Sequence, residues 1–367
     1  STAILELFHG PTAAFKDFGL QLAAAFFNKT LQTQNKTAVV FGATSGDTGS
    51  AAIDACKEFD VIKSFILIPD GNMSEIQRKQ MTTVDKSNVF PILVSGTFDD
   101  CQDIVKKGFS ERSFLRDDQY LLAVNSINWV RIIGQICYYF YASLIVNKLS
   151  HPLNFSVPTG NFGNVFACYA ASKMGMPLEK IIVAVNSNDI LDRFFKNNDY
   201  SKKTVSETIS PSMDISVASN FERLVYDFYL NRNSEACSNL YNNFPEYGIK
   251  IDDEMWQKSE DLFMSYSIND DSTYESMKFY NNEYNYVMDP HTAVAAEAVS
   301  SLKDKLKNKT IILSTAHPAK FPNALKNAGI ISDDIPDNLS KVISKEEVAS
   351  KLSASEDSIF NYIEENN

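Results

Sequence analysis

The chain has 367 residues and a formal net charge of -12. This excess of carboxylates disfavours nucleic acid and anionic membrane surfaces as partners, because both select clustered lysine and arginine. With 44% hydrophobic residues, the chain can bury roughly two or three domains' worth of core. We therefore expect a globular protein in which any anionic ligand is met by local positive groups.

The cysteines and histidines indicate neither disulfides nor a metal site. The five cysteines are far apart, odd in number and free of C-x-x-C spacing. The four histidines lack metal-ligand spacing. No apolar run approaches the ~18 residues of a membrane span, and the start of the chain does not resemble a signal peptide. We expect a cytoplasmic protein with no metal, membrane or nucleic-acid partner.

The first stretch that indicates chemistry is 9–19, H-G-P-T-A-A-F-K-D-F-G, with Lys16 near its centre. The lysine lies between an aromatic residue and an aspartate, just before a small-residue helix predicted over 20–27. Such a position can desolvate and fix an amine, as a Schiff-base lysine requires. A solvated lysine at the start of a helix is the structural alternative.

From 37 to 124 the pattern alternates between strands and helices, which predicts a mostly parallel sheet covered on both faces. Ser74 followed by Gln77 is typical of a capping box that opens another helix. Pro91 favours an edge position or a bulge for its strand. The predicted strands are 37–42, 64–68, 88–94 and 120–124, and the clearest predicted helices are 50–59 and 98–109.

The second half continues this alternation with one interruption. Residues 197–288 are rich in Asn, Ser, Tyr and acidic residues and have helical periodicity, which predicts a helical insertion. The acidic, serine-rich stretch after about Ser332 predicts a solvated tail, with one amphipathic helix near 345–352. The predicted helices are 128–147, 165–174, 292–306 and 323–328, and the predicted strands are 155–158, 181–185 and 310–313.

Two glycine-bearing loops each join a predicted strand to a predicted helix. In 159–164, T-G-N-F-G-N, Gly160 and Gly163 allow close backbone approach, and the neighbouring asparagines add donors. A loop of this kind directs backbone N–H groups and the positive end of a helix at an anion, here a phosphate. Alone, a strand-to-helix turn with glycine is common in α/β proteins.

The other loop, 43–49, places the hydroxyls of Thr44, Ser45 and Thr48 at a second helix N-terminus, which suits a carboxylate. Both loops in one chain with an upstream lysine favour a phosphate-bearing aldehyde cofactor and an amino-acid substrate. Arg131, near the start of a helix predicted to be buried, needs an anionic partner. That partner is either a ligand or a carboxylate in a structural salt bridge.

Together these motifs resemble the threonine synthase family, in the subfamily typified by fungal and enterobacterial enzymes. The order and spacing agree over nearly the whole chain to about Gly329. The motifs are 9–19, A-T-S-G-D-T-G at 43–49, N-S-I-N-W-V-R at 125–131, V-P-T-G-N-F-G-N at 157–164, N-S-N-D at 186–189, D-P-H-T-A-V-A at 289–295 and T-A-H-P-A-K-F at 315–321.

The resemblance implies a fold type II enzyme, similar to the tryptophan synthase β chain, that uses pyridoxal 5'-phosphate to convert O-phospho-L-homoserine and water to L-threonine and phosphate. It implies that Lys16 binds the cofactor as a Schiff base and then moves protons, and that Thr315 meets the pyridine nitrogen. The cofactor phosphate would be held by Gly160, Asn161, Phe162, Gly163 and Asn164.

The remaining roles carried over concern the substrate and the cofactor's 3'-oxygen. Asp47 stands where related enzymes often place an Asn near that oxygen, and Asn128 is a rival for the role. Thr44, Ser45 and Thr48 would hold the substrate carboxylate, and Ser126 and Arg131 the substrate phosphate, with Asn161 as a further contact.

The resemblance also implies two parallel-sheet domains with the cofactor in the cleft between them. We expect a large domain from 1–36 and 125–330, which includes the helical insertion at about 197–288, a small domain at 37–124 and a C-terminal tail at 331–367. Family members carry a further region before the lysine motif, so we expect a form that lacks it. A phospho-lyase giving 2-oxobutyrate and a catalytically inactive binding protein of the same fold are the alternatives. The chain is expected to be a monomer or a homodimer.

Overall fold

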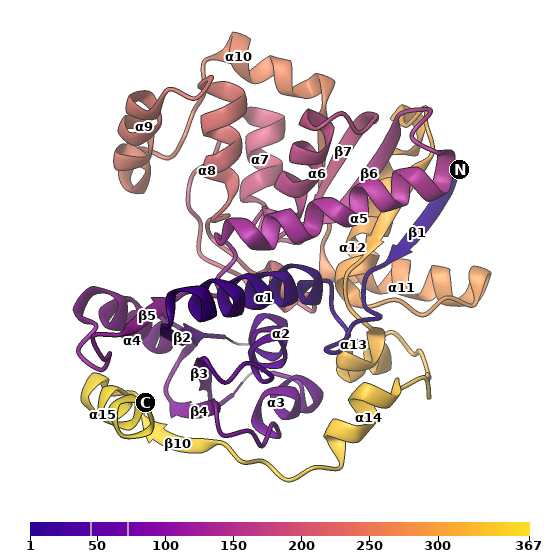
Figure 1. Cartoon of the computed structure of the whole chain (residues 1–367). Coiled ribbons are helices and arrows are strands. Elements are labelled where there is room, and N and C mark those ends of the chain that lie inside the picture. The colour runs from indigo at the N-terminus through magenta and orange to yellow at the C-terminus, as the bar shows by residue number, and fades with distance from the viewer. Residues whose placement is uncertain (45, 72) are drawn as a thin grey trace. The chain divides into compact units, whose positions relative to one another are not determined.

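The computed structural model describes residues 1–44, 46–71 and 73–367. The chain divides into two compact units, the first made of Ser1–Phe8 and Ile132–Asp333 and the second of His9–Arg131 and Asp334–Asn367. Each unit contains a five-stranded sheet in which every pair of neighbouring strands is parallel (Figure 1). The predicted α/β class with two parallel sheets is confirmed.

In the first unit the strand order is β1-β9-β6-β7-β8. The central strands β6 and β9 are buried throughout, and the last five residues of β7 are buried and apolar, as expected for strands covered on both faces. Its strands are β1 (Thr2–Glu6), β6 (Leu153–Pro158), β7 (Leu178–Val185), β8 (Phe263–Ser267) and β9 (Thr310–Ser314). Its helices and helical turns are α5 (Trp129–Asn147, from Ile132), α6 (Gly163–Lys173), α7 (Ile190–Asn197), η1 (Pro211–Met213), α8 (Phe221–Leu224), η2 (Val225–Tyr229), α9 (Ser234–Tyr247), α10 (Asp253–Gln257), η3 (Lys258–Asp261), α11 (Asp270–Tyr284), α12 (Pro290–Leu302), η4 (Lys303–Lys305), η5 (Pro318–Lys320) and α13 (Pro322–Asn327).

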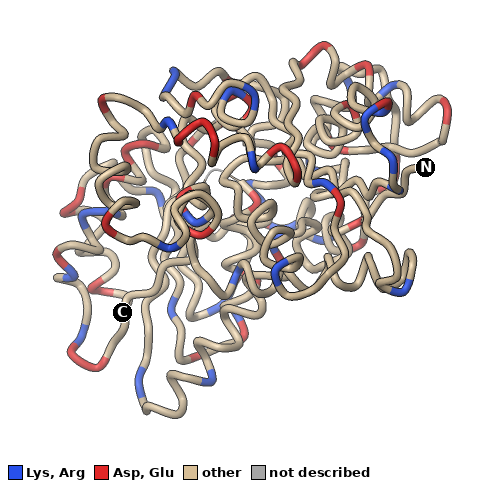
Figure 2. The backbone as a smooth tube through the Cα atoms, turned by 90° about the horizontal axis from the view of Figure 1, so that it is seen from above, with Lys and Arg blue, Asp and Glu red and all other residues tan. Residues whose placement is uncertain are grey.

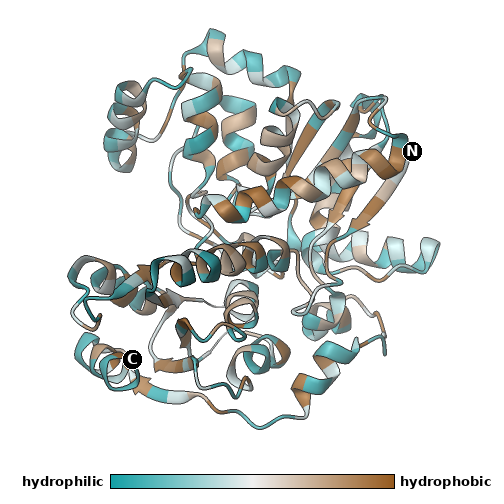
Figure 3. Cartoon of the chain, viewed as in Figure 1, coloured by the Kyte–Doolittle hydropathy of each residue, from teal (hydrophilic) through white to brown (hydrophobic). Residues whose placement is uncertain are grey.

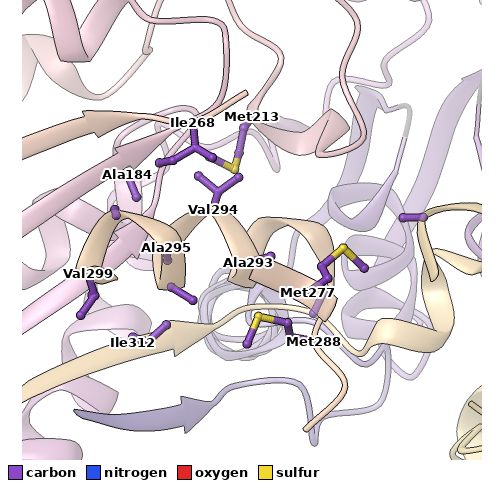
Figure 4. Close-up of a cluster of buried hydrophobic side chains, with 14 of the residues drawn as sticks. Ala184, Met213, Ile268, Met277, Met288, Ala293, Val294, Ala295, Val299 and Ile312 are labelled. Carbon is purple, nitrogen blue, oxygen red and sulfur yellow. The ribbon is translucent and has the colours of Figure 1, made fainter. Parts of the chain in front are cut away.

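Helix α12 lies at the centre of the first unit's core (Figure 4). Its alanines leave room for close approach, and the helix contacts β6, β7 and β9. Val294 and Ile312 are among the buried side chains of this cluster, and neither has measurable exposure. Because side chains of α12 and β9 pack in the same buried cluster, the N-terminal end of α12 and the C-terminal end of β9 are held in fixed positions.

The stretch predicted as a helical insertion is mostly helical, but it also supplies a strand. Strand β8 pairs with β7 from Ile181↔Phe263 to Val185↔Ser267 and forms the edge of the sheet. Its sequence, F-M-S-Y-S, is short and partly polar, because only one of its sides is paired. A sequence pattern of this length carries little strand signal.

In the second unit the strand order is β10-β4-β3-β2-β5. Its strands are β2 (Thr37–Ala43), β3 (Ile62–Pro69), β4 (Val89–Ser95), β5 (Gln119–Leu122) and β10 (Ser350–Ser353). Its helices are α1 (Lys16–Gln34), α2 (Asp47–Cys56), α3 (Glu75–Thr82), α4 (Phe98–Glu111), α14 (Asp337–Ile343) and α15 (Glu356–Asn366). The predicted helix start is confirmed, because Ser74 Oγ accepts from the Gln77 N–H at 3.2 Å and α3 begins at Glu75. The reciprocal bond of a capping box is not found among the described residues, since Gln77 Oε1 accepts from the Ser74 hydroxyl at 3.2 Å.

The division into units differs from the one expected from the sequence. Helix α1 belongs to the second unit, where Leu20, Ala24 and Leu31 share a core cluster with residues of α2 and β3. The segment that ends at Arg131 also groups with this unit. The sequence predicts that α1 belongs to the large domain, because α1 precedes the first strand of the small sheet. The residues against which α1 packs are visible only in three dimensions.

The prediction of a solvated C-terminal tail is wrong for residues 350–366. Strand β10 pairs with β4 in parallel register from Ser350↔Ile92 to Ser353↔Ser95. Helix α15 buries Ile359, Phe360 and Ile363 in a core cluster of the second unit. Strand β4 is consequently not an edge strand, and Pro91 is tolerated because the pairing with β10 begins one residue after it.

Among the described residues, one helix is long and apolar enough to cross a membrane by length and composition, namely α5, with a mean hydropathy of 1.3 over its most apolar window. Brown segments mark its apolar stretches in Figure 3. Half of that window is buried inside the structure, and Tyr139 has no exposed surface. Core helices pass the same test, so the observation is weak evidence for a membrane span.

Candidate active site

The predicted site residues fall into two groups, one in each unit. The second unit holds Lys16, Thr44, Asp47, Thr48, Ser126, Asn128 and Arg131, and the first unit holds the loop 160–164 and Thr315. Ser45, predicted to contact a carboxylate, lies outside the described residues.

The loop before Lys16 is held in a strained conformation by its own side chains. Ala13 is fully buried with φ 54°, in the left-handed region that costs a non-glycine residue about 1–2 kcal/mol. Asp17 holds the loop in place by accepting from the Thr12 N–H at 2.9 Å and from its hydroxyl at 2.6 Å. A Cβ at Gly10 would lie 2.4 Å from Asp17 Oδ2, so this turn requires glycine. Strain sustained in this way is characteristic of functional sites.

Lys16 is the first residue of α1 and faces a buried carboxylate. Its Nζ lies 3.7 Å from Asp47 Oδ2, and its side chain is 11% exposed. The ring of Phe15 lies on another side, with its centroid 5.5 Å from Nζ. Asp47 Oδ1 accepts from Gln77 Nε2 at 2.9 Å, so the carboxylate is fixed by a residue of α3. An amine held between an aromatic face and an oriented carboxylate is suited to covalent chemistry and proton transfer.

Thr44 is joined by hydrogen bonds to two glycines at the start of α2. Thr44 Oγ1 accepts from the Gly49 N–H at 3.0 Å and from the Gly46 N–H at 3.3 Å. A Cβ at Gly49 would lie 2.1 Å from Thr44 Cγ2, which shows how tightly the threonine is enclosed. Thr44 therefore caps the start of α2, whereas Thr48 is half-buried in the first turn of that helix.

Asn128 and Ser126 lie just before α5 and are both half-buried. The Asn128 amide bonds in both directions, since Nδ2 donates to the Ala123 carbonyl at 3.3 Å and Oδ1 accepts from the Val130 N–H at 3.0 Å. This arrangement caps the helix. Asp47, by comparison, has one carboxylate oxygen close to Lys16 Nζ.

Arg131 is a buried cation without a carboxylate partner among the described residues. Its Nη1 donates to the Val124 carbonyl at 2.9 Å, its Nε has no hydrogen-bond partner, and 3% of the residue is exposed. Burial lowers the pKa of the Arg131 guanidinium from 12.5 to about 10, so it remains charged at neutral pH. Acidic and basic segments are interspersed along the chain (Figure 2). An anionic ligand therefore needs a nearby individual cation, and Arg131 can serve as one.

In the first unit, the loop 159–162 joins β6 to α6 in a conformation set by packing. Phe162 adopts φ 63° at the start of α6, and its buried ring packs edge-on against Phe221 at 5.3 Å. A Cβ at Gly160 would lie 2.6 Å from the Ser212 carbonyl oxygen. The Asn161 carbonyl accepts from the Asn220 N–H at 3.0 Å. These contacts hold the loop in place. The N–H groups of the first turn of α6 have no partner within the helix.

Asn164, in the first turn of α6, is oriented by two tyrosines of α5. Its Oδ1 accepts from the hydroxyls of Tyr138 and Tyr139, the latter at 2.7 Å. Burial raises the pKa of both tyrosines well above the usual range, so both hydroxyls keep their protons. Because the amide oxygen is occupied, Nδ2 is the donor that remains, and it has no partner among the described residues.

Thr315 follows β9 and is 5% exposed. Its N–H donates to Thr292 Oγ1 at 3.3 Å, and no partner for its own hydroxyl is found among the residues that the structure describes. The pairing of an orphaned buried amide donor at a helix N-terminus with an available hydroxyl fits the phosphate and the ring nitrogen of pyridoxal phosphate. The first unit can thus hold this cofactor at two points.

One observation links the two groups. Throughout the described parts of the chain, only two buried side-chain nitrogen atoms lack a hydrogen-bond partner, and they are Asn164 Nδ2 and Arg131 Nε. Buried donors without acceptors are costly and normally rare, so each indicates a ligand that supplies the acceptor. Both residues were predicted from the sequence as phosphate contacts.

Several residues around these sites were not predicted from the sequence. In the sequence, Tyr138 and Tyr139 resemble core aromatics of a buried helix, and the spacing of Gln77 from Ser74 indicates only a helix cap. Asp289 and Thr292 carried no role, although D-P followed by an apolar helix is typical of an N-cap with proline at the first position. That signal was available and would have identified Asp289 as a cap.

Comparison with known proteins identifies the family. A family model described as pyridoxal-phosphate dependent enzyme matches residues 4–239, and one described as threonine synthase, C-terminal, matches residues 292–363. The fold and the matched family therefore define a pyridoxal-phosphate dependent enzyme of fold type II, and the predicted cofactor is confirmed.

Individual relatives narrow the family. Threonine synthase of Pseudomonas aeruginosa is 44% identical over 346 residues, which cover 94% of this chain and 73% of that protein. Threonine synthase of Saccharomyces cerevisiae is 42% identical, over 92% of this chain and 72% of that protein. A crystal structure of pyridoxal-phosphate-bound threonine synthase from Brucella melitensis superposes with a TM-score of 0.94 at 38% identity, covering 100% of this chain and 78% of that one. The chain belongs to the threonine synthase family.

Proposed function

We propose that the chain converts O-phospho-L-homoserine and water to L-threonine and inorganic phosphate, with pyridoxal phosphate bound. Membership of the family supports the reaction. The observation that carries the substrate assignment is Arg131, a buried guanidinium with no carboxylate partner among the described residues. An amino acid without a phosphate would leave this cation uncompensated.

The cofactor would be held by residues of the first unit and by Lys16. The loop 160–164 surrounds the phosphate, Asn164 Nδ2 donates to one of its oxygens, and the Thr315 hydroxyl meets the ring nitrogen. A neutral hydroxyl places no charge beside that nitrogen, unlike a carboxylate. When bound, pyridoxal phosphate supplies an aldehyde that condenses with an amine and a conjugated ring that accepts electrons.

Lys16 would move the protons of the reaction. Its Nζ would take the proton from the substrate Cα and then one from Cβ, and loss of the Cβ proton would expel the phosphate from Cγ. A proton would then be returned at Cγ, water would add at Cβ, and the last proton would be returned at Cα. Asp47, 3.7 Å from Nζ, keeps the amine directed while it changes its protonation state. Asp47 is therefore the stronger candidate for the cofactor side of the second unit, and Asn128 remains its rival.

The substrate would be bound through its two anionic ends. Arg131 and Ser126 hold the phosphate, with Asn161 as a further contact, and the guanidinium offsets the charge that builds as phosphate leaves. Thr48 would hold the carboxylate at the start of α2, where the helix dipole favours a negative group. Ser45, which lies outside the described residues, is proposed for the same role from the sequence alone. Thr44 contributes by fixing the loop, since its hydroxyl already serves the backbone.

Two alternatives concern the same site. A phospho-lyase giving 2-oxobutyrate would use the same substrate and the same Arg131, and it is not favoured, since the matched relatives named above are threonine synthases. An inactive protein that binds the cofactor would also retain Lys16. The product and the turnover separate these possibilities.

The test has two parts. Purified protein is incubated with pyridoxal phosphate beside Lys16→Ala, then reduced with borohydride, and the labelled peptide is mapped. We expect a visible absorption band that is absent from the variant, with the label on Lys16. O-Phospho-L-homoserine is then assayed, and we expect equal amounts of threonine and phosphate. Accumulation of 2-oxobutyrate would support the phospho-lyase, and bound cofactor without turnover would support the binding protein.

We also propose that the protein works in the cytoplasm, without nucleic acid or membrane, as a monomer or a homodimer. The net charge of -12 supports the absence of nucleic-acid and membrane partners, because anionic surfaces repel such a protein. Sedimentation velocity over a range of protein concentrations distinguishes the monomer from the dimer.

A further inference from the structure

A buried carboxylate of the first unit lies outside the contacts assigned so far. Asp289 has no exposed surface and caps the N-terminus of α12. Its Oδ1 accepts from the His291 N–H at 2.9 Å and from the His291 ring Nδ1 at 2.8 Å. Its Oδ2 accepts from the hydroxyl of Thr292. A helix cap needs only the backbone contacts, so the two side-chain contacts require another explanation.

The donors and acceptors of this cluster can have only one arrangement. The Ser212 N–H can only donate, and it donates to His291 Nε2 at 3.2 Å, so the ring proton lies on Nδ1 and points to Asp289. The Thr292 hydroxyl donates to the carboxylate, so its lone pairs accept from Ser314 Oγ at 3.1 Å and from the Thr315 N–H at 3.3 Å. Every direction follows from two facts, namely that a carboxylate can only accept and that a backbone N–H can only donate.

The two arms end at the two places where the cofactor would be held. One arm, through Thr292, reaches the backbone of Thr315, whose hydroxyl is proposed to meet the ring nitrogen. The other, through His291, reaches Ser212, whose carbonyl oxygen would lie 2.6 Å from a Cβ on Gly160 of the phosphate loop. The core packing of α12 fixes the point from which both arms start.

We propose that Asp289 is a positioning residue that sets, from one buried carboxylate, both the ring-nitrogen end and the phosphate end of the cofactor site in the first unit. The inference rests on the proposed roles of Thr315 and the loop 160–164. It assigns a specific arm to each end, so the two ends can be perturbed separately. The distance between the two anchor points then depends on groups that do not touch the cofactor.

Three variants separate the arms. Thr292→Val removes one hydroxyl at nearly constant volume, and Thr292→Ser should restore it. His291→Phe removes both ring nitrogens but keeps a ring against Phe321, whose centroid lies 5.0 Å away. Asp289→Asn changes the origin of both arms. The control is Thr273→Val, in which an equally buried threonine of α11 loses a hydroxyl that donates to the Asn269 carbonyl at 2.9 Å.

Apoprotein of each variant is titrated with pyridoxal phosphate and with pyridoxal, which lacks the phosphate, and the absorption band of the bound form is recorded. For Thr292→Val we expect both dissociation constants to rise about tenfold and the band to shift. For His291→Phe we expect the dissociation constant of pyridoxal phosphate to rise about tenfold, whereas that of pyridoxal stays within about twofold. Asp289→Asn should combine both effects, and Thr273→Val should show neither.

The result that overturns the inference is a set of variants that melt at lower temperature but bind both compounds with wild-type affinity and an unshifted band. Asp289 would then act only as a helix cap. If Asp289→Asn does not fold, Thr292→Val and His291→Phe decide the question alone. A wild-type chain that binds no pyridoxal phosphate would contradict the proposed function and this inference together, whereas wild-type binding with silent variants contradicts this inference only.

Discussion

Among the described residues, each unit has one buried side-chain nitrogen donor without a protein acceptor, and the surroundings of the two donors differ. Asn164 is a neutral amide whose oxygen takes two tyrosine hydroxyls, so the direction of its free N–H group is fixed. Arg131 is a charged group for which a single hydrogen bond is found, to the Val124 carbonyl. One donor is firmly oriented and uncharged, and the other is charged and lightly constrained.

This difference matches the two phosphates of the proposed reaction. The cofactor phosphate stays bound through every turnover, so a rigid neutral donor at a helix N-terminus is sufficient. The substrate phosphate gains charge as it leaves, so a full positive charge stabilises it most when it is needed. We therefore expect Asn164 to hold the cofactor phosphate and Arg131 to assist the breaking of the bond between the substrate Cγ and its phosphate.

The largest effect is expected for Arg131→Met. We expect kcat/KM for O-phospho-L-homoserine to fall about 1000-fold, because the leaving phosphate loses its cation. Burial of the unpaired charge disfavours folding at every pH below about 10, so we expect the free energy of unfolding to rise by about 1–4 kcal/mol. Steady-state kinetics and urea unfolding measure both quantities.

The control for this variant is Arg193→Met in the first unit. Arg193 is paired with Asp189 at 2.9 Å and with Asp199 at 2.5 Å, and these partners raise its pKa despite burial. Its removal should lower stability and leave turnover unchanged. Equal destabilisation by both variants would contradict the view that Arg131 is kept for a ligand.

The next effect is expected for Asn164→Asp. The tyrosines can donate to a carboxylate as well as to an amide, so the fold should persist, but a negative charge would face the cofactor phosphate. We expect the dissociation constant of pyridoxal phosphate to rise about 100-fold. Asn243→Asp adds the same charge on the exposed face of α9 and serves as the control. Unchanged cofactor affinity would show that Nδ2 does not face the phosphate.

A pH series distinguishes the two donors in the unmodified protein. A base with a pKa of about 10 is charged below that pH and neutral above it, so inhibition by added phosphate should weaken as pH rises through about 10. The decline should be close to tenfold per pH unit above that point. Bound cofactor, followed by its absorption, should show no loss that depends on Arg131, and Arg131→Met should abolish the pH dependence of inhibition.

The smallest effect is expected for Thr44→Val, which tests the closed loop of the second unit. The Gly46 N–H loses its acceptor and the Gly49 N–H loses one of two, so we expect the free energy of unfolding to fall by about 1 kcal/mol. Thr44→Ser should keep most of this stability. If Thr44→Val instead lowers substrate affinity with no change in stability, the hydroxyl binds the carboxylate and does not cap the helix.

Much of this architecture was predictable, because its signals are local. The alternation of apolar strands with helices, the two glycine-bearing loops and the cap at Ser74 each depend on a few neighbouring residues. Lys16 was recognisable from the aromatic and acidic residues on either side. These features need no knowledge of which segments meet in space.

The remaining features depend on distant contacts. Strand β10 has the sequence S-K-L-S, which shows strand character only when it is paired with β4. Tyr138 and Tyr139 have the composition of a core helix, and their role appears only when the amide of Asn164 lies beside them. The closed state of Thr44 also depends on the close approach of Gly49, which no spacing rule predicts.

The position of β10 has a consequence for how the protein is made. Strands β2 to β5 leave the ribosome early, whereas β10 follows after about 230 further residues, a delay of roughly 10 to 50 s at ordinary rates of synthesis. During that time β4 is an uncovered sheet edge next to apolar surface that α15 later buries. We therefore expect chaperones that bind exposed sheet edges to bind the nascent chain. The rate of translation through the first unit sets how long the edge of β4 stays exposed.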